Sequence, residues 1–507
     1  MFKKRINLIF IIQLVIVFLV AIGFLPRQFS LYLAIGLAGY FLIAPIDELA
    51  IFFVRSIPLF IAIPITSNFD SLTSSRIFSI ILFVRWVNLD KIKNFFKFEK
   101  SNQVHIILVA ILGLALISIT QATGHVLAIK RLIFIINLSL IGFVINDLAK
   151  DKKFRIRIVK NISIPVILVA VVGLIQLIST YFMDIFQFVD FWGGIVERNL
   201  FGNAWANIAL KANTWFAYFG DQLSLRMFSV FPDSHSFPIF LVLGLPAILA
   251  ISLDKIIAKK ENFKSMLHTR ARMLILFVPL IFLDIILTGT RGMWAAGAGS
   301  LFLVVGYWVY FTRHGPDAYR KSVFKYISTY LSVFFLLFAI AYPIFASPQF
   351  QLSKDTSGLL AKRVRSIIDL AETSNSRRIE IWKDSVRSII KHPLFGVGMG
   401  NFPVVVGEDL AKAKAGSSAH NLYLHIAAEI GIPALLATLY LFWLLLKKSY
   451  ENFKAEIDPI LLIYFGASLI FIPWNLLYSL TDVAIFDERA FLLFVATLAV
   501  IFSRKND

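Results

Sequence analysis

Long apolar runs dominate this chain from end to end. Stretches of 15 to 25 mainly apolar residues recur between Leu8 and Phe502. The hydrocarbon core of a bilayer is about 30 Å thick, and a helix needs roughly 20 apolar residues to cross it. Inside hydrocarbon each backbone N–H and C=O must be paired within its own segment, so such runs form helices. We therefore predict an all-α polytopic membrane protein, not the few soluble domains that a length of 507 residues would suggest.

Composition supports this class and excludes some kinds of chemistry. Hydrophobic residues make up 58% of the chain and charged residues only 16%. The absence of cysteine excludes disulfides and thiolate metal sites. The basic N-terminus MFKKR precedes an apolar run, as in a signal peptide, but no small-residue cleavage site follows in IGFLPRQFS. We therefore expect a retained first helix.

The net charge of +19 would also suit a nucleic-acid-binding protein, but its distribution does not. More than half of the Lys and Arg residues lie at the two termini and in short hydrophilic breaks between apolar runs. This is the bias of cytoplasmic loops. We expect membrane lipids around the chain and no nucleic acid as a partner. The basic breaks are residues 89–103, 147–160, 254–272, 312–325 and 447–457.

If these breaks are cytoplasmic, the apolar runs give fourteen crossings with both termini inside. The second to fourth runs are the weakest, so the prediction is about 12–14 transmembrane helices, the number in residues 30–103 being open. The predicted spans are 7–25, 30–46, 49–65, 76–88, 104–121, 126–146, 160–181, 236–253, 272–289, 292–311, 324–346, 420–446, 458–480 and 485–502.

Two long segments then lie outside the membrane and divide the chain into five parts. The second is rich in basic residues, which long loops tolerate during translocation. Within it, Ile379, Trp382, Val386 and Ile389 share one helical face, which predicts an amphipathic helix on the membrane or over a cavity mouth. The five parts are N-terminal helices 1–181, external segment 182–235, helices 236–346, external loop 347–419 and C-terminal helices 420–507.

Polar residues at the outer ends of spans are the candidates for chemistry. Arg291, in LTGTRGMWAA, lies between two spans with almost no loop around it. It is either a snorkelling arginine or a fixed guanidinium that grips a phosphate with two hydrogen bonds. Gly289 and Gly292 beside it would let a ligand approach the backbone. Arg226 is also placed outside, shortly before the span that begins near Ser236.

Histidine is the usual general base near neutral pH. Four of the eight histidines fall at the outer face: His125, His235, His392 and His420. His420 opens a span beside Asn421, where Ser417 or Ser418 could cap the helix, so a purely structural role is the alternative. Asp284 is an acid well inside a span, either functional or paired by an interhelical hydrogen bond.

Four motifs together resemble the O-antigen ligase and polymerase superfamily. They are TGTRG at 288–292, Arg378 and Trp382 in R-x-x-x-W, HPLFGVGMGNF at 392–402 and AHNLYLHIAAEIGIP at 419–433. Their order and spacing match as well, and the resemblance covers roughly residues 200–446. It implies an architecture related to GT-C type glycosyltransferases, with a large helical periplasmic loop.

What this resemblance implies is a membrane glycosyltransferase that needs no metal and no other cofactor. Its donor would be an undecaprenyl-diphosphate-linked glycan and its acceptor a glycolipid or glycan. Carried over, Arg291 and His420 would be catalytic, and Arg226 and Arg291 would bind the diphosphate. FPDSHSFP departs from the family pattern near Arg226. Arg378, Asn421, His235 and Asp284 are candidate supporting residues.

The resemblance leaves several activities open. O-antigen ligation to lipid A core, by one inverting displacement, is the first expectation. An O-antigen or exopolysaccharide polymerase and a protein O-oligosaccharyltransferase share the motifs and differ in the acceptor. A lipid-glycan flippase or transporter is a remote alternative, because the polar motifs lie at the outer boundary and no internal repeat is visible. All readings place the chain in the bacterial inner membrane, with the site facing the periplasm or cell exterior.

Overall fold

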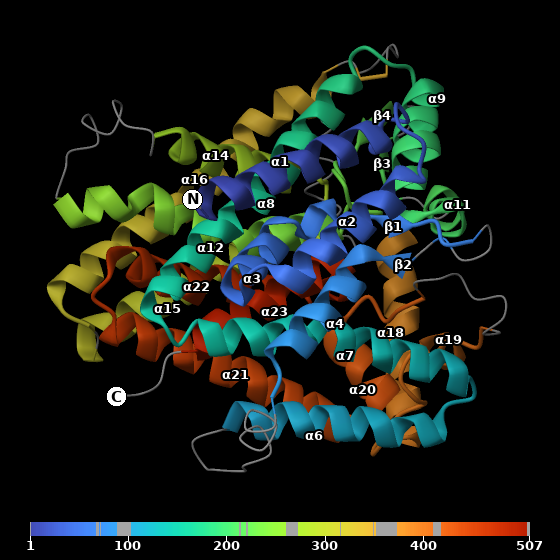
Figure 1. Ribbon diagram of the computed structural model, residues 1–507. Coiled ribbons are helices and arrows are strands. Elements are labelled where there is room, and N and C mark those ends of the chain that lie inside the picture. The colour runs from blue at the N-terminus through green and yellow to red at the C-terminus, as the bar shows by residue number, and fades with distance from the viewer. Residues whose placement is uncertain are drawn as a thin grey trace.

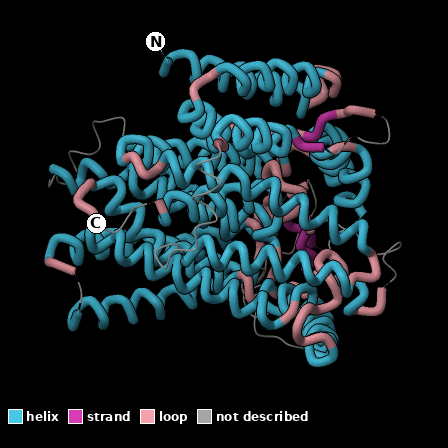
Figure 2. Tube along the Cα trace, turned by 60° about the horizontal axis from the view of Figure 1, so that its bottom comes forward, coloured by secondary structure: helices cyan, strands magenta, loops and turns pink. Residues whose placement is uncertain are grey.

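The computed structural model is a bundle of helices that run side by side (Figure 1). It describes residues 2–66, 70, 72–88, 103–211, 214–219, 222–259, 272–314, 316–347, 349–350, 373–408 and 417–503. Two short antiparallel hairpins lie at the same end of the bundle in both views (Figures 1 and 2). We call this the hairpin end.

The N-terminal part holds the first hairpin, in which Ala62 pairs with Thr73. Its elements are α1 (Phe2–Ala21), α2 (Phe29–Ile43), α3 (Ile46–Arg55), the 3₁₀ turn η1 (Ile57–Leu59), β1 (Ala62–Ile63), β2 (Leu72–Thr73), α4 (Ser74–Trp86), α6 (Gln103–Ser118), η3 (Ile119–Gln121), α7 (His125–Leu148) and α8 (Lys152–Ser179).

The first predicted external segment, 182–235, forms short helices and the second hairpin. These are α9 (Ile185–Phe188), the π-helix η4 (Val189–Glu197), α10 (Arg198–Phe201), α11 (Asn203–Lys211), β3 (Phe216–Phe219) and β4 (Gln222–Leu225). The rest of the chain is helical: α12 (Ser236–Lys259), α14 (Arg272–Leu287), α15 (Arg291–His314), α16 (Ala318–Ala346), α18 (Thr373–Lys391), α19 (Phe402–Val405), α20 (Leu422–Ile430), α21 (Ile432–Ala455), α22 (Pro459–Tyr478), η5 (Ala484–Phe486) and α23 (Glu488–Phe502).

The prediction of an all-α polytopic membrane protein is confirmed. Within the described residues, eight helices are long and apolar enough to cross a membrane. Three shorter apolar helical stretches accompany them: Arg5–Ala21, Phe29–Ile43 and Leu276–Leu287. The count of 12–14 crossings depends on such shorter elements and stays a prediction.

Helices α12 and α22 form the centre of the bundle. Nearly every residue of their apolar stretches is buried. The indole Nε1 of Trp474 in α22 donates a 2.9 Å hydrogen bond to the carbonyl oxygen of Met293 in α15. The N-terminal end of α15 is therefore fixed to one of the two central helices.

The predicted span 49–65 is not one helix. Helix α3 ends at Arg55, and the 3₁₀ turn and strand β1 carry the chain onward to the hairpin end. Pro58 cannot continue an α-helix, and the Arg55 guanidinium instead bonds the side-chain amides of Asn7, at 2.7 Å, and Asn161. The polar groups that interrupt the run are therefore satisfied inside the protein, as the bilayer requires.

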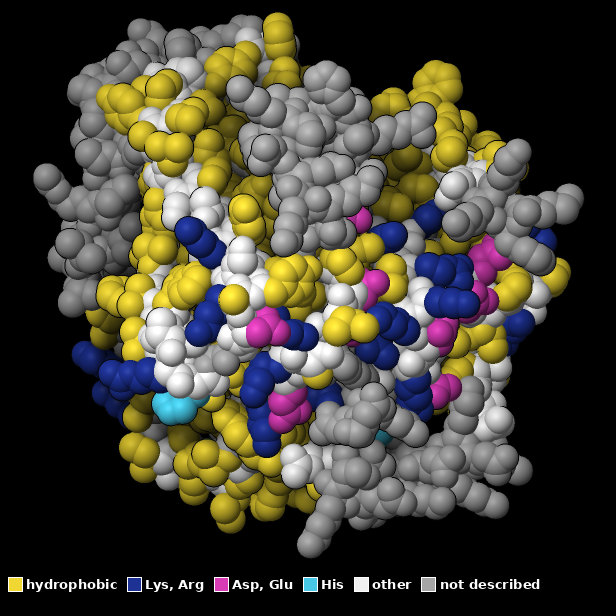
Figure 3. Space-filling model, turned by 90° about the vertical axis from the view of Figure 1, so that its left-hand side faces the viewer, with side chains coloured by type: hydrophobic (Ala, Val, Ile, Leu, Met, Phe, Trp, Pro, Cys, Tyr) yellow, Lys and Arg dark blue, Asp and Glu magenta, His cyan; other side chains and the backbone are white. Residues whose placement is uncertain are grey.

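Basic side chains gather at the end of the bundle opposite the hairpins (Figure 3). Both chain termini lie at this end (Figure 1). Exposed Arg157 pairs with Asp47 at 2.9 Å, and Lys152 pairs with Glu456 at 3.2 Å. The basic breaks 147–160, 312–325 and 447–457 therefore meet at one end, because Arg320 also donates to the carbonyls of Phe453 and Glu456. The breaks 89–103 and 254–272 lie largely outside the described residues.

Candidate functional site

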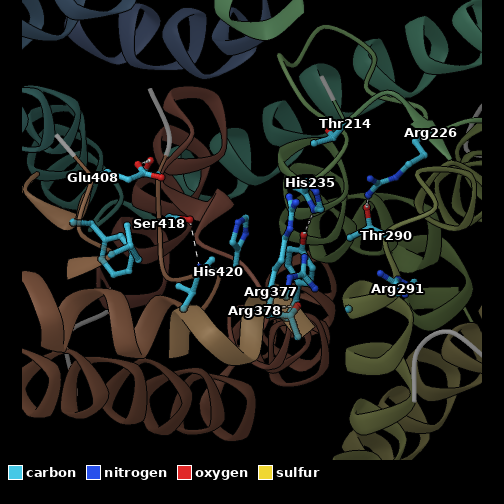
Figure 4. Close-up of a pocket in the computed structure, with 17 residues that line it drawn as sticks. Thr214, Arg226, His235, Thr290, Arg291, Arg377, Arg378, Glu408, Ser418 and His420 are labelled. Atoms are coloured by element: carbon cyan, nitrogen blue, oxygen red, sulfur yellow. Dashed lines mark hydrogen bonds between the residues drawn. The ribbon is translucent and has the colours of Figure 1, made fainter. Parts of the chain in front are cut away.

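A cavity of about 680 Å³ lies at the hairpin end and collects side chains from distant parts of the sequence (Figure 4). Of the predicted site residues, it brings together Arg226, His235, Arg291, Arg378 and His420. Its other lining residues are Thr214, Thr290, Gly292, Arg377, Ile381, Phe402, Val406, Glu408, Ser417, Ser418, Tyr478 and Thr481.

Arg226 is held in place by the turn that contains the TGTRG motif. Its Nε donates to the carbonyl oxygen of Thr288 at 3.1 Å, and its Nη2 lies 3.4 Å from Oγ1 of Thr290. The Thr290 hydroxyl in turn donates to the carbonyl of Ser234 at 3.0 Å. Burial lowers the pKa of Arg226 to about 10, and neighbouring arginines act in the same direction. Arg226 is therefore still a cation near pH 7, with a fixed direction.

Arg291 begins helix α15 directly after this turn, and the glycines beside it serve the fold. Gly289 has a φ of +61°, and a Cβ there would lie 3.2 Å from Cγ of Arg226. A Cβ on Gly292 would overlap Oγ1 of Thr481. Protein side chains therefore occupy the space beside both glycines, which explains why a larger residue would not fit. That a ligand approaches the backbone at these glycines stays a prediction.

Two more arginines reach the cavity from helix α18, which confirms the helix predicted around 379–389. Figure 4 shows Arg377 and Arg378 between His420 on one side and Arg226 and Arg291 on the other. Four guanidinium groups thus line one cavity. Like charges at close range repel, and a polyanionic ligand would relieve that repulsion.

His420 has an unusual backbone conformation, with a φ of +45°. Three contacts hold this segment. The indole of Trp382 donates to the carbonyl of Ala419 at 2.9 Å, the amide of His420 lies 3.3 Å from the Ser418 hydroxyl, and the amide of Leu422 donates to the carbonyl of Ser479 at 2.8 Å. A non-glycine residue at positive φ persists only where its surroundings enforce it, and such residues cluster at functional sites.

Asp482 is a site residue that the sequence prediction missed. Its Oδ2 lies 3.4 Å from Nδ1 of His235 and 3.7 Å from Nδ1 of His420. Burial would raise the pKa of this carboxyl, but His235, His420 and Arg378 lower it below the usual value. Burial lowers the pKa of His235 to about 3, so this imidazole is neutral near pH 7; its Nδ1 also lies 3.1 Å from the Tyr478 hydroxyl.

A signal for Asp482 was present in the sequence. It is the acid in the short loop between the last two predicted spans, at the same end as the other motifs. Tyr478 was hidden, because a tyrosine at the end of an apolar run looks like any interfacial aromatic residue.

Two predicted supporting residues are not in the cavity lining. Asn421 caps helix α20, its side chain accepting from the amides of Tyr423 and Leu424 at 3.0 Å. The cap of α20 is therefore Asn421 and not Ser417 or Ser418, which the sequence had suggested. Asp284 is fully buried in α14, and both of its carboxyl oxygens lack a hydrogen-bond partner among the described residues. Its predicted interhelical hydrogen bond is absent there.

The glycine-rich motif after His392 fills a break in the predicted span 420–446. Helices α20 and α21 are separated at Gly431, whose φ is +98°. The amides of Val397 and Gly398 donate at 2.9 Å to the carbonyls of Ala428 and Glu429, and the amide of Ile432 donates to the carbonyl of Pro393 at 2.8 Å. The motif thus satisfies the backbone groups of a broken helix and supports the segment that carries His420.

The fold and the cavity define a multi-pass helical membrane protein with a cationic site at one end. Residues 275–439, about a third of the chain, match the family model described as O-antigen ligase. This part of the chain is therefore similar to the O-antigen ligases, in agreement with the motifs, and the family supports glycan transfer of the ligase or polymerase type. No curated protein matches the chain. Arg226 and Asp482 lie outside the matched residues.

Proposed function

We propose that this protein transfers a glycan from an undecaprenyl-diphosphate carrier to an acceptor hydroxyl, with the lipid A core as the acceptor of first choice. One observation carries the proposal: four arginines and His420 line the same cavity, and Asp482 lies 3.7 Å from Nδ1 of His420. A polyanion and a proton acceptor are the two requirements of such a transfer.

The arginines would act on the leaving group. Breaking the bond between the anomeric carbon and the phosphate oxygen leaves its electron pair on the diphosphate. Arg226 is already oriented by Thr288, so it stabilises the developing charge without reorganisation. Arg291, Arg377 and Arg378 add positive charge from the other elements that line the cavity. In this proposal the arginines neutralise the diphosphate and no metal is required.

His420 would act on the acceptor. Its Nδ1 is directed toward Asp482, which leaves Nε2 to take the proton of the acceptor hydroxyl. The acceptor oxygen then forms the new bond to the anomeric carbon as the diphosphate departs. The Asp482 carboxylate stabilises the imidazolium that results, as a buried acid does for a catalytic histidine elsewhere. One displacement inverts the anomeric configuration.

Reconstitution tests the proposal. The purified full-length protein in nanodiscs receives an undecaprenyl-diphosphate glycan and, separately, lipid A core, a second lipid-linked glycan or a peptide with free hydroxyls. We expect transfer to lipid A core; transfer to the second or third acceptor alone would identify a polymerase or a protein O-oligosaccharyltransferase. No transfer to any of them would overturn the proposal.

Arg291→Lys is the matched variant for the diphosphate. It keeps the charge but loses the planar fork that binds two phosphate oxygens, so most activity should be lost. Lys321→Arg is the control, because Lys321 lies near the start of α16 and does not line the cavity. Full activity of a well-folded Arg291→Lys protein would show that Arg291 is only a snorkelling residue.

A further inference from the structure

The arginines line the cavity on one side of His420, whereas an acidic residue and two serines line it on the other side. Figure 4 shows Glu408 and Ser418 on one side of His420, with Arg226 and Arg291 on the other. The Ser417 hydroxyl donates to Oε2 of Glu408 at 2.7 Å. We call Glu408, Ser417 and Ser418 the acidic wall. All three residues line the cavity.

The direction of the displacement assigns the two substrates to the two walls. In a single displacement the incoming oxygen and the departing oxygen lie on opposite sides of the anomeric carbon. If the diphosphate binds the arginines, the acceptor hydroxyl must approach from the far side, where the acidic wall stands. His420 lies between the two walls, where it can reach that hydroxyl (Figure 4).

The acidic wall suits a sugar that carries hydroxyl groups. An ionised carboxylate has about four lone-pair sites, and Ser417 uses one of them, so Glu408 can accept further hydrogen bonds. Hydroxyls of serine both donate and accept, as sugar hydroxyls do. A phosphate group would be repelled by the same carboxylate, because like charges at close range destabilise a complex.

We propose that the acidic wall is the acceptor subsite and that Glu408 selects an acceptor sugar without a phosphate beside the receiving hydroxyl. This rests on the proposed function and adds the substrate class of its second site. Glu408 acts through binding and specificity, whereas His420 performs the proton transfer.

The test uses full-length protein in nanodiscs with the lipid-diphosphate donor. Two synthetic acceptors differ only by a phosphate on the carbon next to the receiving hydroxyl. Glu408→Gln removes the charge and keeps the shape. We expect the KM for the neutral acceptor to rise about 10-fold, because a hydrogen bond to a charged group is lost, with the donor KM unchanged. The preference for the neutral acceptor over the phosphorylated one should fall by a similar factor.

Ser417→Ala is the second variant and should raise the acceptor KM less, because the carboxylate remains. Glu380→Gln is the control, since Glu380 is exposed on α18 and does not line the cavity. Transfer with unchanged acceptor KM and unchanged preference in Glu408→Gln would overturn the acceptor subsite alone. If Glu408→Gln raised the KM for the donor and not the KM for the acceptor, that result would also overturn the acceptor subsite. Absence of transfer by the unaltered protein would overturn the proposed function, and the subsite with it.

Discussion

The indole of Trp382 donates a hydrogen bond of 2.9 Å to the carbonyl oxygen of Ala419, the residue directly before His420. The R-x-x-x-W motif therefore has two roles in one helix. Arg378 lines the cavity, and Trp382, one turn further along the same helix, holds the backbone that presents the proposed base. The helix predicted to cover a cavity mouth is thus part of the site itself.

Replacing Trp382 by Phe should lower turnover by about 5- to 10-fold. The ring still fills its place, but the Ala419 carbonyl loses its partner, at a cost of about 1–2 kcal/mol that loosens His420. Donor affinity should not change. Trp443→Phe is the control, because Trp443 is half exposed on α21. Equal turnover in the two variants would show that the hydrogen bond does not position His420.

The exchange His420→Asn separates catalysis from folding. Asparagine tolerates positive φ, so it should preserve the backbone, but it cannot accept a proton near pH 7. We expect turnover to fall by roughly 10²- to 10⁴-fold, the scale of general base catalysis, while donor binding survives. The measurements are transfer rate and donor affinity on folded protein.

His235→Asn is the comparison, because His235 is the other imidazole beside Asp482. Its amide can still bond the Tyr478 hydroxyl, so the loss should be much smaller. If His235→Asn is inactive and His420→Asn is not, the base lies in the segment 226–238. If both are active, transfer relies on positioning and electrostatics alone.

The orientation in the membrane can be tested with single cysteines, because the chain has none. Asp190 is exposed in the π-helix at the hairpin end, and Lys153 is exposed at the basic end. In intact cells an impermeant thiol reagent should label Asp190→Cys and leave Lys153→Cys unlabelled. The reverse pattern would place the cavity on the cytoplasmic side.

Much of the fold could be predicted because a bilayer allows few structures. An apolar run must pair its own backbone, so hydropathy alone located most helices. The prediction failed at residues 49–65, where Arg55 and Pro58 end the helix. Partners distant in the sequence, Asn7 and Asn161, make that interruption stable, and hydropathy along the chain carries no information about them.

Site residues that stand in sequence motifs could be predicted. Site residues that are recognised only by their position in the folded structure were missed. Arg291 and His420 stand in recognisable motifs, and both line the cavity. Asp482 becomes informative only when the loop after α22 is placed beside His420, which requires the tertiary fold. Asp284 does not line this cavity, and its supporting role stays a prediction.

The break between α20 and α21 has a consequence for biogenesis. The groups that pair its backbone belong to residues 393–398, which leave the ribosome before residues 422–455 do. When the interrupted helix reaches the translocon, the segment that pairs with it has therefore already been synthesised. In a circular permutant that reversed this order, the short helix would enter the membrane while its carbonyls lacked their hydrogen-bond donors. We expect such a permutant to be degraded instead of assembled.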